Sequence, residues 1–284
     1  RGSFMTLKKM GAVLGVVALS LFLASCGNKQ EASSSAEVTE ESSVQEETSK
    51  EITSLYDGRI TLVKPGFDEK IKELKKKNTD VVGWISLDGT DSAYPLLQAE
   101  DNEYYLRRNI NKKYDVYGIP FLDMENTAML TDQNTVIYGH MTYGKDVQQF
   151  GALRFYLDQK YTDKSPKTVT ITTENGIYTY RLFSIRNVSE DAPYRDANMK
   201  DAVYAALIKE TVEGSKIDFD YHTPITTKDR ILTLSTCTPN KIEDERLVIA
   251  GVLEKAEVTK EAFEAFKTVF SEGAESAPAE ISAE

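Results

Sequence analysis

The chain has 284 residues, of which 40% are hydrophobic, and it carries a formal net charge of -11 with a pI near 4.9. This length fits one domain of ordinary size with a sizeable core, plus tails. The acidic balance excludes a nucleic-acid-binding protein, which needs a basic footprint to displace phosphate counterions, and the two cysteines and two histidines show no paired spacing typical of a metal site.

The N-terminal segment has the pattern of an export signal. Residues 1–4, RGSF, precede Met5, the first candidate initiator, and are interpreted as a cloning remnant or upstream translation with no part in the fold. After a basic pair, Lys8 and Lys9, an apolar run from residue 10 to 23 leads into LASC, which ends at Cys26 and resembles the lipobox of bacterial lipoprotein signal peptides. The resemblance implies cleavage before Cys26 and diacylation of its sulfur. The alternative is an uncleaved signal anchor, but the run is shorter than the ~20 residues of a spanning helix.

Both alternatives place the rest of the chain outside the cytoplasmic membrane, where it divides into three parts. Residues 27–53 are rich in Ser, Glu, Gln and Thr and predict a disordered acidic tether. Residues 54–256 carry the periodic patterns of a folded domain. Residues 257–284 predict a helix from Thr259 to Phe270, which we expect to pack on the domain rather than bind a partner, and then an acidic tail.

The folded segment opens with a predicted helix over residues 65–80, after which short β-patterned runs dominate. These runs cover residues 81–89, 92–98, 118–124, 135–141, 167–188, 225–237 and 246–255. An Asn-Gly turn at Asn175 and Gly176 predicts a hairpin within the fifth run. One helical insert, residues 198–213, interrupts the strands, with Ala202, Val203, Ala206, Leu207 and Val212 expected on one side. Many short strands with few helices favour a mainly β barrel.

Three chemically reactive side chains stand at the ends of β-patterned runs. Cys237 ends one run, His140 follows another, and Arg246 opens a third. If Cys26 carries lipid, Cys237 has no intramolecular partner, so a structural disulfide does not explain it. Taken singly, each also has a structural explanation: Cys237 as a small buried hydrophobe, His140 as a histidine with its hydrogen bonds satisfied, and Arg246 as a solvated charge at a strand edge. Their combination favours a catalytic site, whereas His222 lies beside a proline without a comparable strand.

The segment TLSTC, Thr233 to Cys237, is similar to the Thr-Leu-x-Thr-Cys signature of the sortases, and Arg246 opens the next strand where that family has its arginine. IYGHM, which contains His140, matches the family's histidine segment. Within the sortases the chain resembles class B from about residue 67 to 253, including the extra helix that this class carries between its sixth and seventh strands. Two departures are the Met141 that follows the histidine, where class B often has asparagine, and the lipoprotein-type signal in place of an N-terminal membrane helix.

The resemblance implies a closed β-barrel of about eight strands, with N-terminal helices and a helical insert before the strand that carries Cys237. It also implies an enzyme without a redox cofactor or a required metal. Chemically, a thiolate is a good nucleophile for an amide carbonyl, and His140 is the natural proton carrier because its ordinary pKa lies near neutrality. Arg246 would stabilise the tetrahedral oxyanion, with the backbone N–H of Thr238 as a second donor.

Other site residues are assigned from position alone. We expect Ser235 and Thr236 to support the site, and the substrate-binding residues are predicted at strand ends: Leu96, Tyr143, Ile185 and Tyr194.

The family further implies that the substrates are surface proteins or pilins with a C-terminal sorting signal of the Asn-Pro-x-Thr or Leu-Pro-x-Thr type, cleaved after its threonine. The acceptor is an amine on a peptidoglycan precursor or, alternatively, a lysine of a pilin subunit. The expected location is the outer face of the cytoplasmic membrane of a Gram-positive bacterium. A non-enzymatic surface lipoprotein that keeps the barrel as a binding module is a third hypothesis. A papain-like protease is disfavoured because that scaffold places its cysteine before its histidine.

Overall fold

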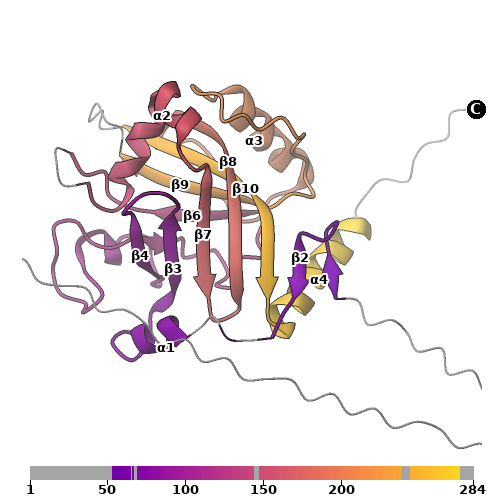
Figure 1. Cartoon of the computed structure of the whole chain (residues 1–284), viewed down its shortest axis with the longest axis horizontal. Helices are drawn as coiled ribbons and strands as arrows, with labels where there is room; N and C mark the ends of the chain where they lie inside the picture. Colours follow the sequence, from indigo (N-terminus) through magenta and orange to yellow (C-terminus); the bar gives the residue numbers. More distant parts are fainter. Residues whose placement is uncertain (1–52, 65, 67–68, 144–146, 238–243, 276–284) are drawn as a thin grey trace, which may run out of the picture. The chain divides into compact units, whose positions relative to one another are not determined.

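The computed structural model describes residues 53–64, 66, 69–143, 147–237 and 244–275, with the backbone alone at Cys237 and at 272–275. Within these ranges ten strands form one sheet (Figure 1). The strands are β1 (Ser54–Leu55), β2 (Ile60–Leu62), β3 (Val81–Leu87), β4 (Ala93–Leu97), β5 (Phe121–Leu122), β6 (Asn134–Tyr138), β7 (Thr168–Thr173), β8 (Gly176–Ser189), β9 (Ile231–Cys237) and β10 (Glu245–Val258).

Four α-helices and two 3-10 helices accompany the strands in the part of the chain that the structure describes. They are α1 (Glu69–Lys75), η1 (Tyr104–Arg107), η2 (Phe150–Leu157), α2 (Gln159–Lys164), α3 (Asp201–Glu213) and α4 (Lys260–Glu275). The predicted mainly β class is therefore confirmed, as is the insert that precedes the strand ending at Cys237.

The sheet closes because β10 pairs with two partners at once. The strand order β10-β8-β7-β3-β4-β5-β6-β9 returns to β10 through the additional β10–β9 pairing, which makes a closed barrel of eight strands. β9 pairs with β6 in parallel and with β10 in antiparallel. The far half of β10 continues past β9 and pairs with β2, so β1 and β2 extend the sheet outside the barrel. The predicted closed barrel is confirmed.

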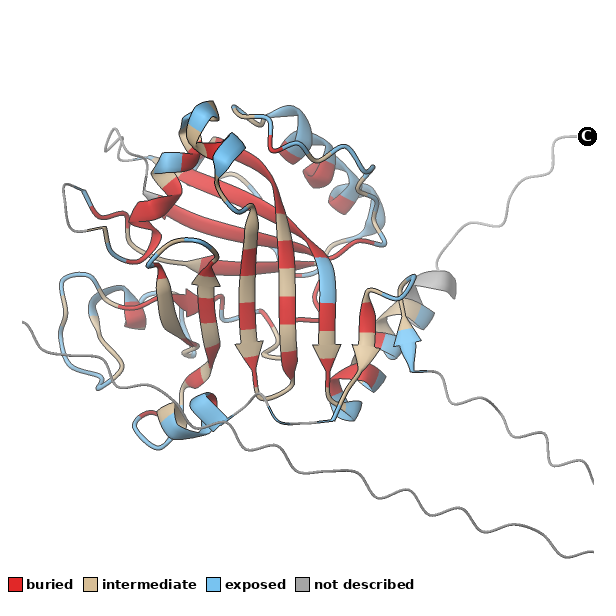
Figure 2. Cartoon of the chain, viewed as in Figure 1, coloured by how far each residue is buried: buried red, intermediate tan, exposed pale blue. Residues whose placement is uncertain are grey.

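Alternation of apolar side chains builds the barrel interior. In β3 every second residue is buried, and Ile85 and Leu87 belong to the interior cluster. The strands β8 and β10 are different, because each has a stretch of consecutive buried residues (Figure 2). Leu247 and Ile249 face the interior, whereas Val248 packs in a second cluster with residues of α3. The helix covers the outer face of these strands, so both of their faces are buried.

The insert forms the predicted helix, but of the five residues expected to share one side only Leu207 is buried. Val203 and Val212 are both 48% exposed, and Ala202 and Ala206 are exposed too. The buried positions are Tyr204, Leu207, Ile208 and Thr211, which follow the i, i+3, i+4, i+7 spacing of one helical face. The Tyr204 hydroxyl allows the burial of its ring because it donates to the backbone carbonyls of Gln133 (2.6 Å) and Asp229 (2.8 Å).

The predicted hairpin is confirmed as β7 and β8, with Thr172 opposite Ile177. Its glycine has a different role from the one an Asn-Gly turn suggests. Neither turn residue has a positive φ, but a Cβ at Gly176 would lie 2.8 Å from the carbonyl oxygen of Glu257. Glycine is needed there because β10 approaches closely.

The C-terminal helix α4 packs into the same core as the barrel. Ala262, Phe263 and Phe266 are at most 2% exposed and belong to the interior cluster, so this helix is part of the folded unit. At the other end of the domain, α1 packs at the start of β3, where Ile71 lies in a cluster with Val81.

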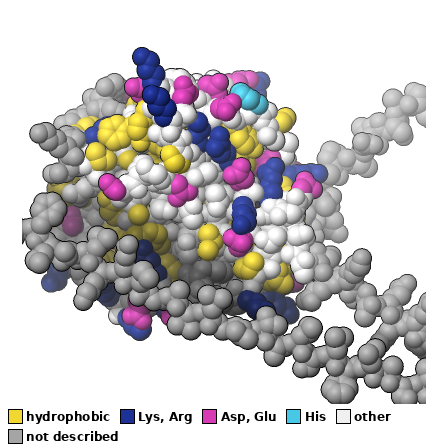
Figure 3. Space-filling view, viewed as in Figure 1, with side chains coloured by type: hydrophobic (Ala, Val, Ile, Leu, Met, Phe, Trp, Pro, Cys, Tyr) yellow, Lys and Arg dark blue, Asp and Glu magenta, His cyan; other side chains and the backbone are white. Residues whose placement is uncertain are grey.

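The predicted signal peptide, Cys26 and the residues of the tether before Thr53 lie outside the described residues, as do residues 276–284 of the acidic tail. In the ranges that are described, no helix is both long and apolar enough to cross a membrane. On the face drawn in Figure 3, acidic and basic side chains are interspersed, with no large field of one sign.

Candidate active site

Three neighbouring strands bring the predicted reactive residues to one end of the barrel. Cys237 is the last residue of β9 and is the register partner of Arg246 at the start of β10. His140 follows the end of β6, the parallel neighbour of β9. The chain is held there by the backbone N–H of Gly139, which donates to the carbonyl of Ser235 (3.2 Å). The barrel register therefore places all three positions on adjacent strands.

A cleft of about 430 Å³ opens at this end of the barrel. His140 and Arg246 both line it, together with the predicted Ser235, Thr236 and Tyr194. The other described residues that line it are Asn102, Glu103, Leu106, Phe121, Tyr138, Gly139, Glu190 and Arg195.

The imidazole of His140 is half-buried and has a defined orientation. Its Nε2 lies 2.7 Å from the carbonyl oxygen of Leu106, and because a carbonyl only accepts, Nε2 carries the proton of this hydrogen bond. Burial lowers the pKa of His140 below its ordinary value. The hydrogen bond to Leu106 raises this pKa, and the positive charge of Arg107 lowers it further. The neutral ring therefore predominates at neutral pH, with Nδ1 unprotonated.

The guanidinium of Arg246 is anchored on two sides. Its Nη2 forms a salt bridge with Glu190 (2.5 Å), and its Nη1 donates to the carbonyl of Glu245 (3.1 Å). The Arg246 side chain is 24% exposed and that of Glu190 is 45% exposed. The cation is therefore fixed at the mouth of the cleft rather than buried within the core.

The supporting residues lie on β9 itself. The Ser235 hydroxyl is 3.0 Å from the hydroxyl of Tyr194, which is 2% exposed. The hydroxyl of Thr236 is buried and has no hydrogen-bond partner among the described residues. Thr238, proposed as a backbone donor, lies outside the described residues.

Only one of the four predicted substrate-binding residues lines the cleft among the described residues. Tyr194 lines the cleft. Leu96 and Ile185 are fully buried in the interior cluster and do not line it, because their side chains point into the barrel. Tyr143 is 40% exposed and is not among the described residues that line the cleft. Met141 is only 6% exposed and packs in the interior cluster, so this position makes an apolar contact.

Several cleft residues were not selected from the sequence. Asn102 donates to Asp123 (2.9 Å), which also accepts from the Tyr138 hydroxyl (2.6 Å), so a buried carboxylate fixes two side chains of the lining. Glu190, which holds Arg246, comes just after the end of β8. These residues stand on loops and element ends, where hydrophobic periodicity gives no signal.

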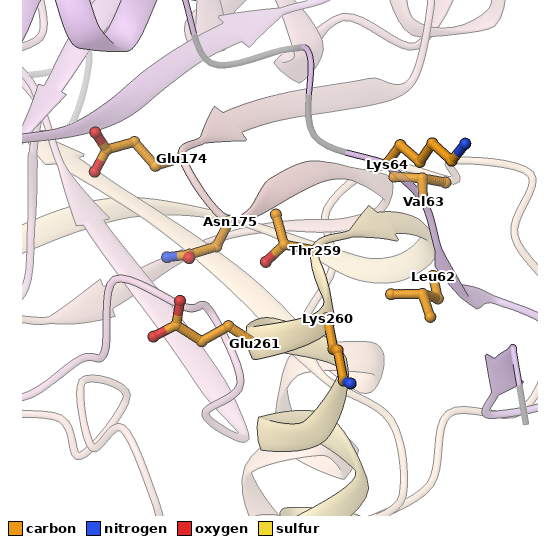
Figure 4. A pocket seen from close by; sticks show the side chains of 8 residues that line it. All are labelled: Leu62, Val63, Lys64, Glu174, Asn175, Thr259, Lys260 and Glu261. Carbon is orange, nitrogen blue, oxygen red and sulfur yellow. The ribbon is translucent and has the colours of Figure 1, made fainter.

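A larger hollow, of about 690 Å³, lies at the opposite end of β8 and β10 (Figure 4). It is bounded by the β7–β8 turn, the end of β2 and the start of α4, and its lining contains neither cysteine nor histidine. No group of three side chains suited to a metal ion occurs within the described ranges. Among the described residues, the side chains predicted to be reactive therefore lie at the smaller cleft and not at this hollow.

Comparison with known proteins identifies the family of the segment that contains this cleft. Residues 85–254 match the family model of the sortase domain. Sortase B of Listeria monocytogenes is 33% identical over 200 residues, which cover 69% of this chain and 79% of that protein. Sortase B of Staphylococcus aureus is 33% identical over 195 residues, which cover 68% and 76%.

Solved structures agree with these relatives. A Staphylococcus aureus sortase B–substrate complex has a TM-score of 0.59 at 32% identity, covering 65% of this chain and 84% of that one. A sortase B complexed with triglycine has a TM-score of 0.60 at 30% identity, covering 68% and 88%. Clostridium perfringens sortase B has a TM-score of 0.58 at 28% identity, covering 64% and 98%.

Proposed function

Because this chain belongs to the sortase family and is a class B sortase, a cysteine transpeptidase, we propose that it cleaves a C-terminal sorting signal after threonine and joins that threonine to an amine of a peptidoglycan precursor. One observation carries the residue assignment: Cys237 and Arg246 are register partners, and the strand end beside them bears His140. Cys237 is proposed as the nucleophile, His140 as the acid and base, and Arg246 as the oxyanion donor.

The first half of the reaction breaks the peptide bond. The Cys237 thiol gives its proton to Nδ1 of His140, and the resulting thiolate attacks the threonine carbonyl, whose C=O electron pair moves to oxygen to form a tetrahedral oxyanion. When this intermediate collapses, the C–N bond breaks and protonated His140 gives its proton to the departing amine. Nε2 is occupied by the hydrogen bond to Leu106, so Nδ1 is the atom that transfers the proton. The acyl group remains as a thioester on sulfur.

The second half forms the new amide. The acceptor amine attacks the thioester carbonyl and loses a proton to Nδ1 of His140, and the C–S bond then breaks to release the Cys237 thiolate. Atoms and charges balance without an oxidant or a metal. The lowered pKa of His140 keeps its ring ready to accept this proton at neutral pH.

Arg246 is suited to the oxyanion because its planar cation is already anchored before the charge develops. Its contacts with Glu190 and the carbonyl of Glu245 fix the fork, so little reorganisation is needed in the transition state. The backbone N–H of Thr238 is proposed as the second donor, with Ser235 and Thr236 as supporting neighbours.

The relatives support the proposed substrates. One Staphylococcus aureus sortase B has been solved as a substrate complex, and another sortase B with triglycine. A peptide amine therefore fits the proposed acceptor better than a small-molecule nucleophile does. The relatives from Gram-positive bacteria support a place at the cell surface, with attachment to the membrane through lipidated Cys26 or an uncleaved anchor.

Mass spectrometry of the full chain, incubated with Asn-Pro-x-Thr and Leu-Pro-x-Thr peptides, tests the proposal. We expect an adduct on Cys237 whose mass is that of the peptide up to threonine, and none on the Cys237→Ala variant. A peptidoglycan-type amine should release it. Release by a pilin lysine alone would favour pilus assembly, and a reactive Cys237 that forms no adduct with any peptide would favour a binding module.

A further inference from the structure

Gln149 is a buried polar residue beside the active-site cleft to which the proposed reaction assigns no role. It precedes η2 and is only 3% exposed. Its backbone has φ 45° and ψ -122°, in the left-handed half of the map, which a residue with a side chain rarely adopts. Such a conformation persists only where the surrounding contacts determine it, and these residues cluster at functional sites.

The Gln149 side chain uses its oxygen and both of its N–H groups. Oε1 accepts the backbone N–H of His140 (2.9 Å), and Nε2 donates to the carbonyls of Tyr117 and Gly118, the latter at 3.1 Å. This arrangement fixes which amide atom is which. The reverse orientation would place an NH2 against an N–H and an oxygen against two carbonyls.

The backbone of Gln149 is equally constrained. Its N–H donates to the hydroxyl of Tyr94 (2.9 Å), and its carbonyl accepts from the hydroxyl of Ser92 (2.8 Å). Both partners belong to the β3–β4 region of the barrel wall. The unusual backbone conformation is therefore held from outside, and it aims the amide at the segment that carries His140.

Gly118 connects this amide to the hydrogen-bond partner of the imidazole. Gly118 has φ 56°, and a Cβ built on it would lie 2.5 Å from the carbonyl oxygen of Leu106. The next residue, Ile119, donates its N–H to the carbonyl of Tyr105 (3.2 Å). The backbone at Gly118 is thus packed directly on the carbonyl that accepts from Nε2 of His140.

We propose that Gln149 is a positioning residue for His140. The hydrogen bond in question joins Nε2 of His140 to the carbonyl of Leu106. The Gln149 amide contacts both sides of it, because it binds the main chain of His140 and the Gly118 backbone that packs on the Leu106 carbonyl. Holding both sides fixes the tilt of the imidazole and leaves Nδ1 directed at the reacting atoms. The inference rests on the proposed role of His140 as proton carrier, but the geometry it predicts exists without substrate.

Gln149→Ala removes the amide that links the main chain of His140 to the Gly118 backbone. The ring nitrogen of His140 and the Leu106 carbonyl are then no longer held in place relative to each other. We expect kcat to fall about 10- to 100-fold, because a displacement of about 1 Å at a reacting group costs up to about 100-fold, while KM changes little. Gln149→Glu, of the same size, keeps the acceptor for the His140 N–H but sets an oxygen against two carbonyls, so it should lose similar activity.

The direct measurement is NMR of the 15N-labelled full chain, in which the ring Nε2–H of His140 gives a signal protected from exchange with water. A His222→Gln background leaves His140 as the only histidine. We expect the signal in the parent protein and its loss in Gln149→Ala. Gly118→Ala should also abolish it, because the added methyl displaces the Leu106 carbonyl.

Asn126→Ala is the matched control. Asn126 is 5% exposed, accepts the backbone N–H of Val136 (2.8 Å) and donates twice, to Asp132 and to the carbonyl of Asn134. It should lower the melting temperature about as much as Gln149→Ala but keep the ring signal and kcat. A ring signal and kcat unchanged in Gln149→Ala, or lost equally in Asn126→Ala, would overturn the inference. If the parent shows the signal but transfers no peptide, the proposed function fails instead.

Discussion

Replacement of Arg246 by lysine keeps the positive charge and removes the planar fork, so it tests the proposed oxyanion role directly. In the resting structure the fork uses Nη2 for Glu190 and Nη1 for the carbonyl of Glu245. Lysine has a single nitrogen, which cannot keep both anchors and also donate to an oxyanion in a fixed direction. The loss of one oxyanion donor costs about 2.7 to 4 kcal/mol, or about 100- to 1,000-fold in kcat.

Part of the electrostatic attraction survives in Arg246→Lys, so we expect the lower end of that range, about 100-fold in kcat. Steady-state cleavage of a sorting peptide measures it, and urea unfolding should show little change because the Arg246 side chain is partly exposed. Arg181→Lys, on the wall strand β8 away from the cleft lining, is the matched control and should retain activity.

Glu190→Gln separates the oxyanion role from simple anchoring. An ion pair this exposed contributes about 0 to 1 kcal/mol, so losing the anchor alone should cost no more than about fivefold in kcat. The reasoning is refuted if Arg246→Lys retains kcat within about threefold of the parent. It is refuted equally if Glu190→Gln loses as much as Arg246→Lys does.

Burial and charge lead to four further predictions. Burial, and then the charge of Arg107, lower the pKa of His140, so Arg107→Gln should raise that pKa in an NMR titration, and a fall would contradict the assignment. Because the folded state binds this proton less readily than the unfolded chain, stability is lost as pH falls below 6.5 toward the folded pKa. Tyr204→Phe should cost about 1 to 3 kcal/mol of unfolding free energy in urea, since its hydroxyl donates to two backbone carbonyls. Phe266→Ala should cost about 3 to 5 kcal/mol, whereas the exposed Val212→Ala should stay within about 0.5 kcal/mol; equal losses would mean that α4 is not part of the core.

The strands and the Cys237–Arg246 pair were accessible from the sequence because both depend on local patterns. Alternation of apolar residues marks β3, whereas β6 is marked by a short apolar run, and the sequence places Cys237 at the end of one run and Arg246 at the start of the next, where β9 and β10 are found. The face of α3 was not recovered, because Tyr204 is buried only through carbonyls supplied by two distant segments.

For the predicted substrate-binding residues, the sequence did not indicate which face of a strand each side chain occupies. Leu96 stands beside Leu97, and the two adjacent leucines pack in different clusters, one in the barrel interior and one outside it. One register shift in the β3–β4 pair and two in the β8–β10 pair change which residues face inward. Because these strands carry apolar residues on both faces, the sequence does not indicate which residues point into the barrel. Leu96 and Ile185 could therefore be assigned to strands but not to one face of the sheet.

The orientation of His140 could not be read from the sequence for a further reason. Its partner is a backbone carbonyl 34 residues earlier, and a carbonyl belongs to every residue type, so it carries no compositional signal. Cys237 and Arg246 are fixed relative to each other by the β9–β10 ladder, whereas the imidazole is fixed through loops. Of the three residues, His140 is therefore the one whose position is most sensitive to a substitution in a loop. Since Leu106 also lines the cleft, a peptide that contacts it acts on the residue whose carbonyl orients the ring.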